Sequence, residues 1–168
     1  MAFDGLIRVV KEDDLTGDGV GHTTPKYTLG AKHLKNGNEY VYICADKTLL
    51  TGKYGVLVPD GTSLCSGYTL TYSNASLNGW LAGVAQNTIA TGNYGFVMTK
   101  GVALITGDSG EVSAAPGVDL ALGTNGGFVA AGATFSTAPR FAVTINSFVT
   151  VTTGSNPTSK ARIFGSIL

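Results

Sequence analysis

The chain has 168 residues, a length that fits one domain, and its 11 basic and 11 acidic side chains leave no formal net charge. Charged residues make up 13% of the sequence, against the ~25% that is usual for soluble domains. A neutral chain without a basic cluster lacks the attraction on which nucleic-acid binding depends, so we expect no nucleic-acid partner. The longest apolar runs are only a few residues, so we also expect no membrane partner.

The chain begins with an irregular stretch, residues 1–25, in which charges are interspersed with glycines and no helical period is visible. We expect it to form an extended N-terminal arm that becomes ordered on a partner. Its acidic start is unlike a signal peptide, which favours synthesis in a reducing cytoplasm. Cys44 and Cys65 are then best interpreted as small buried thiols rather than as a disulfide or metal pair.

Residues 26–168 contain short runs rich in β-branched and aromatic residues, separated by turn-forming Gly, Asn, Asp and Pro. This is the pattern of β-strands. The runs are Tyr40–Cys44, Tyr54–Val58, Tyr68–Tyr72, Tyr94–Met98, Val102–Ile105, Phe128–Ala130, Phe141–Ile145 and Phe148–Thr152. A helix over 76–85 is disfavoured by two internal glycines. We therefore predict an all-β fold, with 26–168 forming a single-domain small β-barrel or β-sandwich of short antiparallel strands.

An internal repeat occurs at an offset of 40 residues. Segment 45–67 aligns without gaps on segment 85–107, with nine of 23 positions identical. Thr-Gly-x-Tyr-Gly in each copy predicts a turn followed by a strand that begins with Tyr, and two such hairpins could pair with approximate two-fold symmetry. Because Asp46, Lys47 and Lys53 of the first copy become Gln86, Asn87 and Asn93 in the second, we interpret the first hairpin as solvated and the second as covered. The charge-free stretch 61–99 is our candidate for a face that meets another subunit.

No group of residues predicts catalysis, so we expect that the protein is not an enzyme and has no cofactor. Gly107-Asp-Ser-Gly110 matches the nucleophile segment of chymotrypsin-like proteases, but the surroundings of His22 and His33 do not resemble that family's histidine segment. Asp14-x-Thr16-x-Asp18-Gly19 matches the opening of an EF-hand loop, but Pro25 replaces the bidentate Glu at position twelve. We therefore predict neither a catalytic nor a metal site.

Segment 81–103, which includes Ala90-Thr-Gly-Asn-Tyr-Gly-Phe-Val97, resembles a phrase found in the capsid decoration (cement, or head-stabilising) proteins of tailed bacteriophages. Segments 122–132 and 161–165 are similar in style to such proteins. The resemblance implies a small β-fold protein that binds the outer surface of the phage shell. There it would bridge subunits of the major capsid protein, commonly as a trimer.

These implications set our expectations for partners and location. We expect a virion protein on the capsid surface, assembled in the bacterial host cytoplasm, whose partners are the major capsid protein and itself. A homotrimer is favoured and a dimer is possible, and low charge suits such permanent interfaces. The candidate interface residues come from the arm, from just upstream of the second copy of the repeat, and from that copy itself: Phe3, Leu6, Ile7, Val9, Trp80, Tyr94 and Phe96. Deleting residues 2–20 should then leave a folded core that no longer binds capsids.

An alternative of a different class is a carbohydrate- or receptor-binding β module of a phage tail or fibre. Such a module would stack sugar rings on exposed aromatic side chains, for which Tyr54, Trp80 and Tyr94 are the candidates. Burial of these side chains would remove the platform.

Overall fold

Among the residues that the structure describes, the regular structure consists of ten β-strands, most of which begin or end at the turn formers of the sequence. In a computed structural model of the chain, the described residues are Leu15, 20–57, 69–71, 81–108, 115–123, 126–130, 142–144 and 158–163. The strands are β1 (Lys32–Lys35), β2 (Asn38–Ala45), β3 (Tyr54–Leu57), β4 (Thr69–Thr71), β5 (Leu81–Ala85), β6 (Tyr94–Thr106), β7 (Asp119–Leu122), β8 (Phe128–Ala130), β9 (Ala142–Thr144) and β10 (Thr158–Ile163). The prediction of a small all-β domain is confirmed. The expected strand 148–152 lies outside the described residues.

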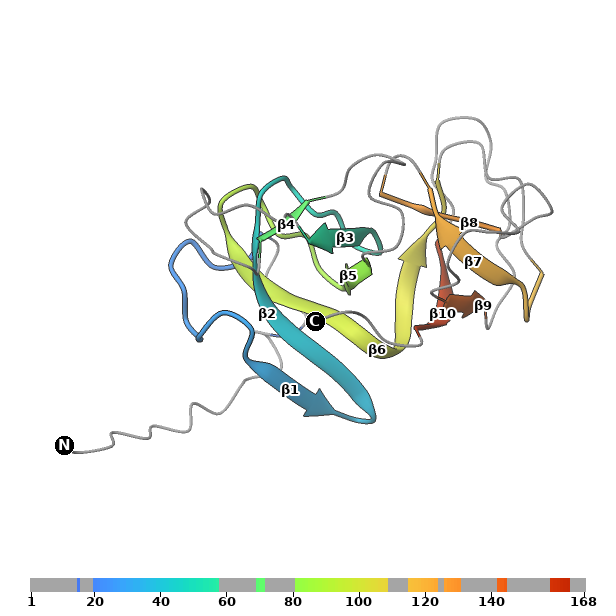
Figure 1. The fold of residues 1–168 in the computed structure, drawn as a ribbon, viewed down its shortest axis with the longest axis horizontal. Coiled ribbons are helices and arrows are strands. Elements are labelled where there is room, and N and C mark those ends of the chain that lie inside the picture. Colours follow the sequence, from blue (N-terminus) through green and yellow to red (C-terminus); the bar gives the residue numbers. More distant parts are fainter. Residues whose placement is uncertain are drawn as a thin grey trace.

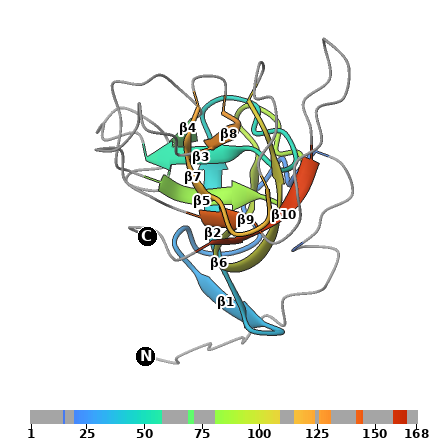
Figure 2. The ribbon, with the colours of Figure 1, turned by 90° about the vertical axis from the view of Figure 1, so that its right-hand side faces the viewer.

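The strands pair in the order β1-β2-β4-β3-β5-β6-β10-β9-β7-β8, and an additional pairing joins β2 to β6 (Figure 1). Every pairing is antiparallel except that of β2 with β4, which is parallel. The β2–β6 pairing curls the sheet back on itself, but several of the other contacts comprise only two residue pairs, and the strands do not form a continuous closed barrel. The β1–β2 hairpin projects from the rest of the domain in both views (Figures 1 and 2).

Strand β6 is 13 residues long and joins the two parts of the sheet. Its first half pairs with β2 and β5, and its second half, from Gly101, pairs with β10 (Figure 1). The sequence predicted two separate strands here, 94–98 and 102–105, because Lys100 and Gly101 interrupt the apolar pattern. That prediction was wrong: Gly101 has a φ of 123°, which lets the strand bend without ending.

A β-bulge at Thr99 keeps one core continuous along β6: Tyr40 lies opposite Met98 and Glu39 opposite Lys100, so Thr99 is an extra residue on this strand. Phe96 and Met98 face the larger core cluster before the bulge, whereas Ala103 and Ile105 face it afterwards, so the alternation of the strand shifts by one residue. The Asn38 side chain holds the bend at Gly101, because its Oδ1 accepts a hydrogen bond of 3.0 Å from the Val102 N–H. A Cβ at position 101 would collide with that same side chain.

The buried side chains of the described residues form two clusters on opposite faces of β2. The larger cluster takes Tyr40 and Tyr42 from β2 and extends to residues of β7, β8, β9 and β10. The smaller takes Val41, Ile43 and Ala45, together with residues of β5, β6 and the repeat. Because β2 is buried on both faces, its sequence is a continuous apolar run rather than an alternating one.

The two copies of the repeat, in their described parts 45–57 and 85–97, have the same backbone pattern and pair with each other. Leu49 and Ile89, which are aligned in the repeat, exchange both backbone hydrogen bonds, at 2.9 and 2.8 Å. The Ala45 N–H donates to the Asn93 carbonyl and the aligned Ala85 N–H donates to the Lys53 carbonyl. Such reciprocal contacts are those of a two-fold axis. The repeat therefore forms an antiparallel pair of hairpins with approximate two-fold symmetry.

The symmetry is broken because β6 covers only one side of the pair. The Thr106 N–H donates to the Gly52 carbonyl at 2.8 Å, and the Gln86 side chain bonds both backbone groups of Leu104, at 2.9 and 3.1 Å. The side covered by β6 therefore contains the Gly52 turn of the first copy and the Gln86 bend of the second. On the opposite side, Asp46 and Lys47 are exposed. The interpretation of one solvated and one covered hairpin was wrong, because the covered side and the exposed side of the pair each contain residues of both copies.

Part of the expected N-terminal arm lies against the domain. His22 exchanges backbone hydrogen bonds of 2.7 and 2.8 Å with Tyr94 of β6, and the Val20 carbonyl accepts hydrogen bonds from the Ala90 N–H and from the Asn93 side chain. Leu15 is 1% exposed and belongs to the larger core cluster. Deleting residues 2–20 would therefore remove a core side chain and a set of backbone contacts, so that deletion would test more than capsid binding.

Candidate functional site

Two regions of the described surface and core contain the side chains on which a function could depend: a buried polar site around Asp108, and the aromatic and exposed residues of β1, β6 and β10. Asp108 is the acidic residue of the Gly107-Asp-Ser-Gly110 motif and is 4% exposed. Its N–H donates to the Phe128 carbonyl at 2.9 Å, which ties the end of β6 to β8. A side chain at Gly123 would collide with the Asp108 carboxylate, so the absence of a Cβ there makes room for it.

Tyr54 is the neighbour of Asp108 in this site. Its side chain is 2% exposed, its ring meets Phe128 edge-on at 5.8 Å, and its hydroxyl donates a hydrogen bond to the Gly123 carbonyl. Burial, and to a smaller extent the negative charge of Asp108, raise the pKa of Tyr54 to about 12. The arrangement holds a neutral phenol and a carboxylate inside the core, where their contacts link β3, the end of β6, β8 and Gly123.

We expect the free energy of unfolding to fall between pH 10 and 12 by about 2–3 kcal/mol on account of Tyr54. The phenol stays neutral in the folded chain up to about pH 12, whereas in the unfolded chain it ionises near its ordinary value of 10.0. The stabilisation is therefore complete below pH 10 and is lost as the pH rises through 12. Urea unfolding at pH 8 to 12 should show this fall, and the Tyr54→Phe variant should lose less stability over the same interval. Equal losses in the two proteins would contradict the assignment.

The histidines of the rejected protease hypothesis lie elsewhere. His22 Nδ1 is 3.1 Å from the Tyr42 hydroxyl, which also accepts a hydrogen bond of 3.1 Å from the Lys26 N–H. The His33 ring lies 6.5 Å from that of Phe96. Both histidines thus contact the aromatic cluster on β2 and β6, whereas Asp108 lies beside β8. Ser109 is outside the described residues.

The predicted interface residues fall into two groups. Tyr94 is half-buried and stacks on Tyr42, with ring centroids 6.4 Å apart. Phe96 is 1% exposed and lies 4.9 Å from the Tyr42 ring, so it is a core residue and offers no surface to a partner. Phe96 lies on the face of β6 that is turned toward the core. The sequence alone did not indicate which face of this strand is buried. The remaining candidates are outside the described residues and stay predictions: Phe3, Leu6, Ile7, Val9 and Trp80.

The aromatic platform of the carbohydrate-binding alternative is reduced by the same packing. Tyr54 is buried beside Phe128, and half-buried Tyr94 lies against Tyr42. Of the two described aromatic residues proposed for stacking, only Tyr94 is partly accessible, and Trp80 lies outside the described residues.

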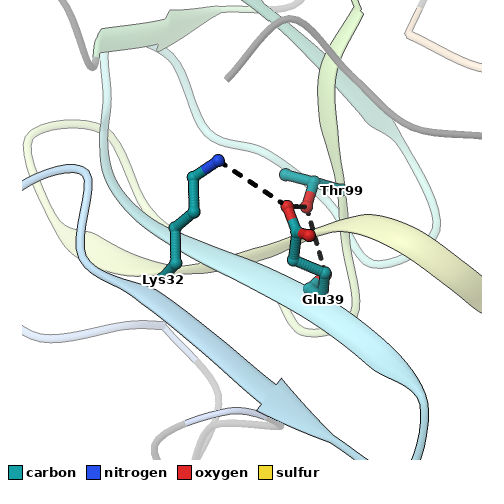
Figure 3. Close-up of polar contacts among 3 residues, drawn as sticks. All are labelled: Lys32, Glu39 and Thr99. Atoms are coloured by element: carbon teal, nitrogen blue, oxygen red, sulfur yellow. Dashed lines mark hydrogen bonds and ion pairs between the residues drawn. The ribbon is translucent and has the colours of Figure 1, made fainter.

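A polar contact fixes the β1–β2 hairpin to β6 (Figure 3). The Thr99 hydroxyl donates to Glu39 Oε1 at 3.0 Å, and Lys32 Nζ lies 3.9 Å from the same oxygen. Thr99 is 1% exposed, whereas the Lys32 side chain is largely in solvent. A surface ion pair of this length contributes little to stability, so the contact serves mainly to orient Glu39 at the bulge between Glu39 and Tyr40.

Sequence reasoning missed an exposed face formed by the second half of β6 and by β10. Val102 and Leu104 are 38% and 39% exposed, and in the register of the sheet they lie opposite Arg162 and Lys160, which are also exposed. The signal was present in Ser159–Ile163, where Lys160 and Arg162 alternate with smaller or apolar residues, but 158–163 was not predicted to be a strand. We refer to Val102, Leu104, Lys160 and Arg162 as the β6–β10 outer face.

The described part of the chain lacks two other kinds of site. It contains no cluster of three or more His, Cys, Asp or Glu side chains placed to hold a metal ion. Nor does it contain a helix with the length and hydropathy needed to cross a membrane. The EF-hand-like residues Asp14, Thr16 and Asp18 are not among those described. Cys44 is buried in β2, while Cys65 also lies outside the described residues.

The fold and the buried polar site thus define an all-β domain built on a curled, mostly antiparallel sheet. No family model matches the sequence, and no curated protein matches it. Among solved structures, the fold is similar to that of the N base of the head fiber gp8.5 of bacteriophage phi29, with a TM-score of 0.50. The two sequences are 13% identical, and the match covers 77% of this chain and 97% of the other. At that identity the likeness shows a shared fold.

Proposed function

We propose that the chain is a structural protein of a bacteriophage virion that binds the outer surface of the head. The observation that carries the proposal is the shared fold with a phage head fiber base, of which 97% is covered by the match. The resemblance of segment 81–103 to capsid decoration proteins supports it independently, because it rests on sequence. In this proposal the chain bridges neighbouring subunits of the major capsid protein and stabilises the shell, after assembly in the host cytoplasm.

The proposal assigns the chain a binding role without catalysis or cofactor, and self-association into a homotrimer. The role of Asp108 supports the first part, since its carboxylate is buried at the joint between β6 and β8. The low content of charge supports the second, because permanent interfaces between identical subunits are depleted in charge. Light scattering on the full chain should give three times the mass of one chain, and a monomer would contradict the trimer.

The function is tested by adding the purified chain to empty capsids of the phage that encodes it. We expect the chain to sediment with the capsids and to raise the temperature at which the shell comes apart. Electron microscopy of these capsids should show its density over the contacts between neighbouring shell subunits. A chain that stays in the supernatant would contradict head binding, and binding without any change in shell stability would contradict bridging.

A second candidate is the base of a fibre that carries a receptor- or carbohydrate-binding region. The specific observation in its favour is that the similar solved structure is itself the base of a head fiber. In this case the density would attach at single points on the shell and continue outward, and the thermal stability of the shell would not change. The same micrographs and melting curves therefore distinguish the two candidates.

A further inference from the structure

The β6–β10 outer face combines features that are unusual for the open side of a sheet. On its inner side, Ala103, Ile105, Ala161 and Ile163 are each no more than 1% exposed and belong to the larger core cluster. On its outer side two aliphatic side chains alternate with two cationic ones across the ladder, as Val102 opposite Arg162 and Leu104 opposite Lys160. The outer side of a half-solvated sheet is ordinarily polar, so exposed Val and Leu here indicate a surface suited to being covered.

The charge of this face has one sign. Strands β6 and β10 contain Lys100, Lys160 and Arg162 and no acidic residue, while in the register of the sheet Glu39 of β2 lies opposite Lys100 and Asp119 of β7 lies two strands beyond Arg162. Residues 61–168 contain four basic side chains in all, so three of the four lie on two neighbouring strands of a chain with no net charge. Within the described residues, neither Lys160 nor Arg162 forms an ion pair. Concentrated positive charge of this kind selects a partner with negative charge.

The mixture of side chains favours a protein as that partner. Covering the aliphatic side chains between the cations with apolar surface stabilises a complex, and a second protein provides such surface at the centre of an interface. Nucleic-acid binding on a sheet would instead use aromatic side chains for base stacking, and the outer face has none. An acidic protein surface with an apolar centre is therefore complementary to the β6–β10 outer face both in charge and in hydrophobicity.

We propose that the β6–β10 outer face is the docking surface of this chain, and that it binds an acidic, partly apolar patch on the phage shell protein. This inference rests on the proposed head-binding function and names the residues by which it is performed. Arg162 and Lys160 would pair with carboxylates of the shell, while Val102 and Leu104 cover the apolar centre of the contact. The face lies along β10, at the end of the molecule toward the viewer in Figure 2.

The charge part is tested with the Lys160→Glu/Arg162→Glu variant of the full chain on purified empty capsids. We expect the Kd for capsids to rise at least about tenfold, and the binding of the unmodified chain to weaken as salt is added. The matched control is Lys26→Glu/Lys47→Glu, which changes the net charge equally at two exposed lysines away from this face and should leave the Kd within about twofold. The charge reversal replaces two exposed basic side chains by two acidic ones, so the domain should stay folded. Circular dichroism of the variant checks this.

The apolar part is tested with Val102→Thr/Leu104→Thr, compared with Leu50→Thr at another exposed leucine, which is 48% exposed. Only the double variant should weaken capsid binding. If the unmodified chain binds capsids and both face variants bind equally well, the docking surface is wrong while the proposed function survives. If the unmodified chain does not bind capsids, the proposed function itself fails. Binding to duplex DNA that the charge reversal abolishes, or a changed oligomeric state with unchanged capsid binding, would also overturn the inference.

Discussion

Gly52→Ala is expected to lower the free energy of unfolding by about 2–4 kcal/mol, one of the two largest effects of a single substitution predicted for this chain. Gly52 has a φ of 78°, a left-handed conformation that costs an alanine about 1 kcal/mol. A Cβ there would also lie 2.9 Å from the Thr106 N and 3.0 Å from the Ile105 carbonyl carbon. Both are backbone atoms of β6 that cannot move away, since the Thr106 N–H is bonded to the Gly52 carbonyl. Chemical denaturation measures the loss.

The repeat supplies the control for this experiment. Gly92 occupies the aligned position of the second copy, has a φ of 77° and donates the equivalent backbone hydrogen bond, but a Cβ there meets nothing within 4 Å. Gly92→Ala should therefore cost only the conformational part, about 1 kcal/mol. The difference between the two variants measures how tightly β6 covers one side of the repeat. Equal losses would mean that β6 does not rest on the Gly52 turn.

Leu15→Ala is expected to lower the free energy of unfolding by about 2–5 kcal/mol, the usual cost of the cavity left by a buried leucine. Leu15 is 1% exposed and belongs to the larger core cluster, although it lies within the segment whose composition predicts an irregular arm. A loss of this size would show that the N-terminal segment contributes to the folded domain even without a partner. Thermal and denaturant unfolding of the isolated chain measure it.

Leu34→Ala provides the matched substitution on the surface. Leu34 lies on β1 and is 73% exposed, so the same change in side chain should alter stability by no more than about 0.5 kcal/mol. If Leu15→Ala proves equally harmless, the arm does not pack into the core. In that case the deletion of residues 2–20 would leave the core intact and would test capsid binding alone.

Local patterns predicted the parts of the fold that depend on short-range chemistry. The strands over 40–44, 54–57 and 94–98 follow from β-branched and aromatic runs between turn formers, and the repeat follows from two Thr-Gly-x-Tyr-Gly turns. Each needs only neighbouring residues to specify it. For the candidate site the sequence predicted less. Aromatic residues such as Phe96 and Tyr54 occur both in cores and at interfaces with partners. The neighbouring sequence does not show in which of these two environments each side chain lies.

The scarcity of charge, the short β-branched and aromatic runs and the 40-residue repeat are evident from the sequence by itself, and they predicted an all-β chain in which two hairpins could pair. The tertiary structure alone decided which side of that pair is covered, and that Gly101 bends β6 instead of ending it. It also decided that Lys160 and Arg162 meet Val102 and Leu104 across a ladder. These features depend on contacts between residues some 50 to 60 positions apart, whose register is set by burying one face of each strand against the core.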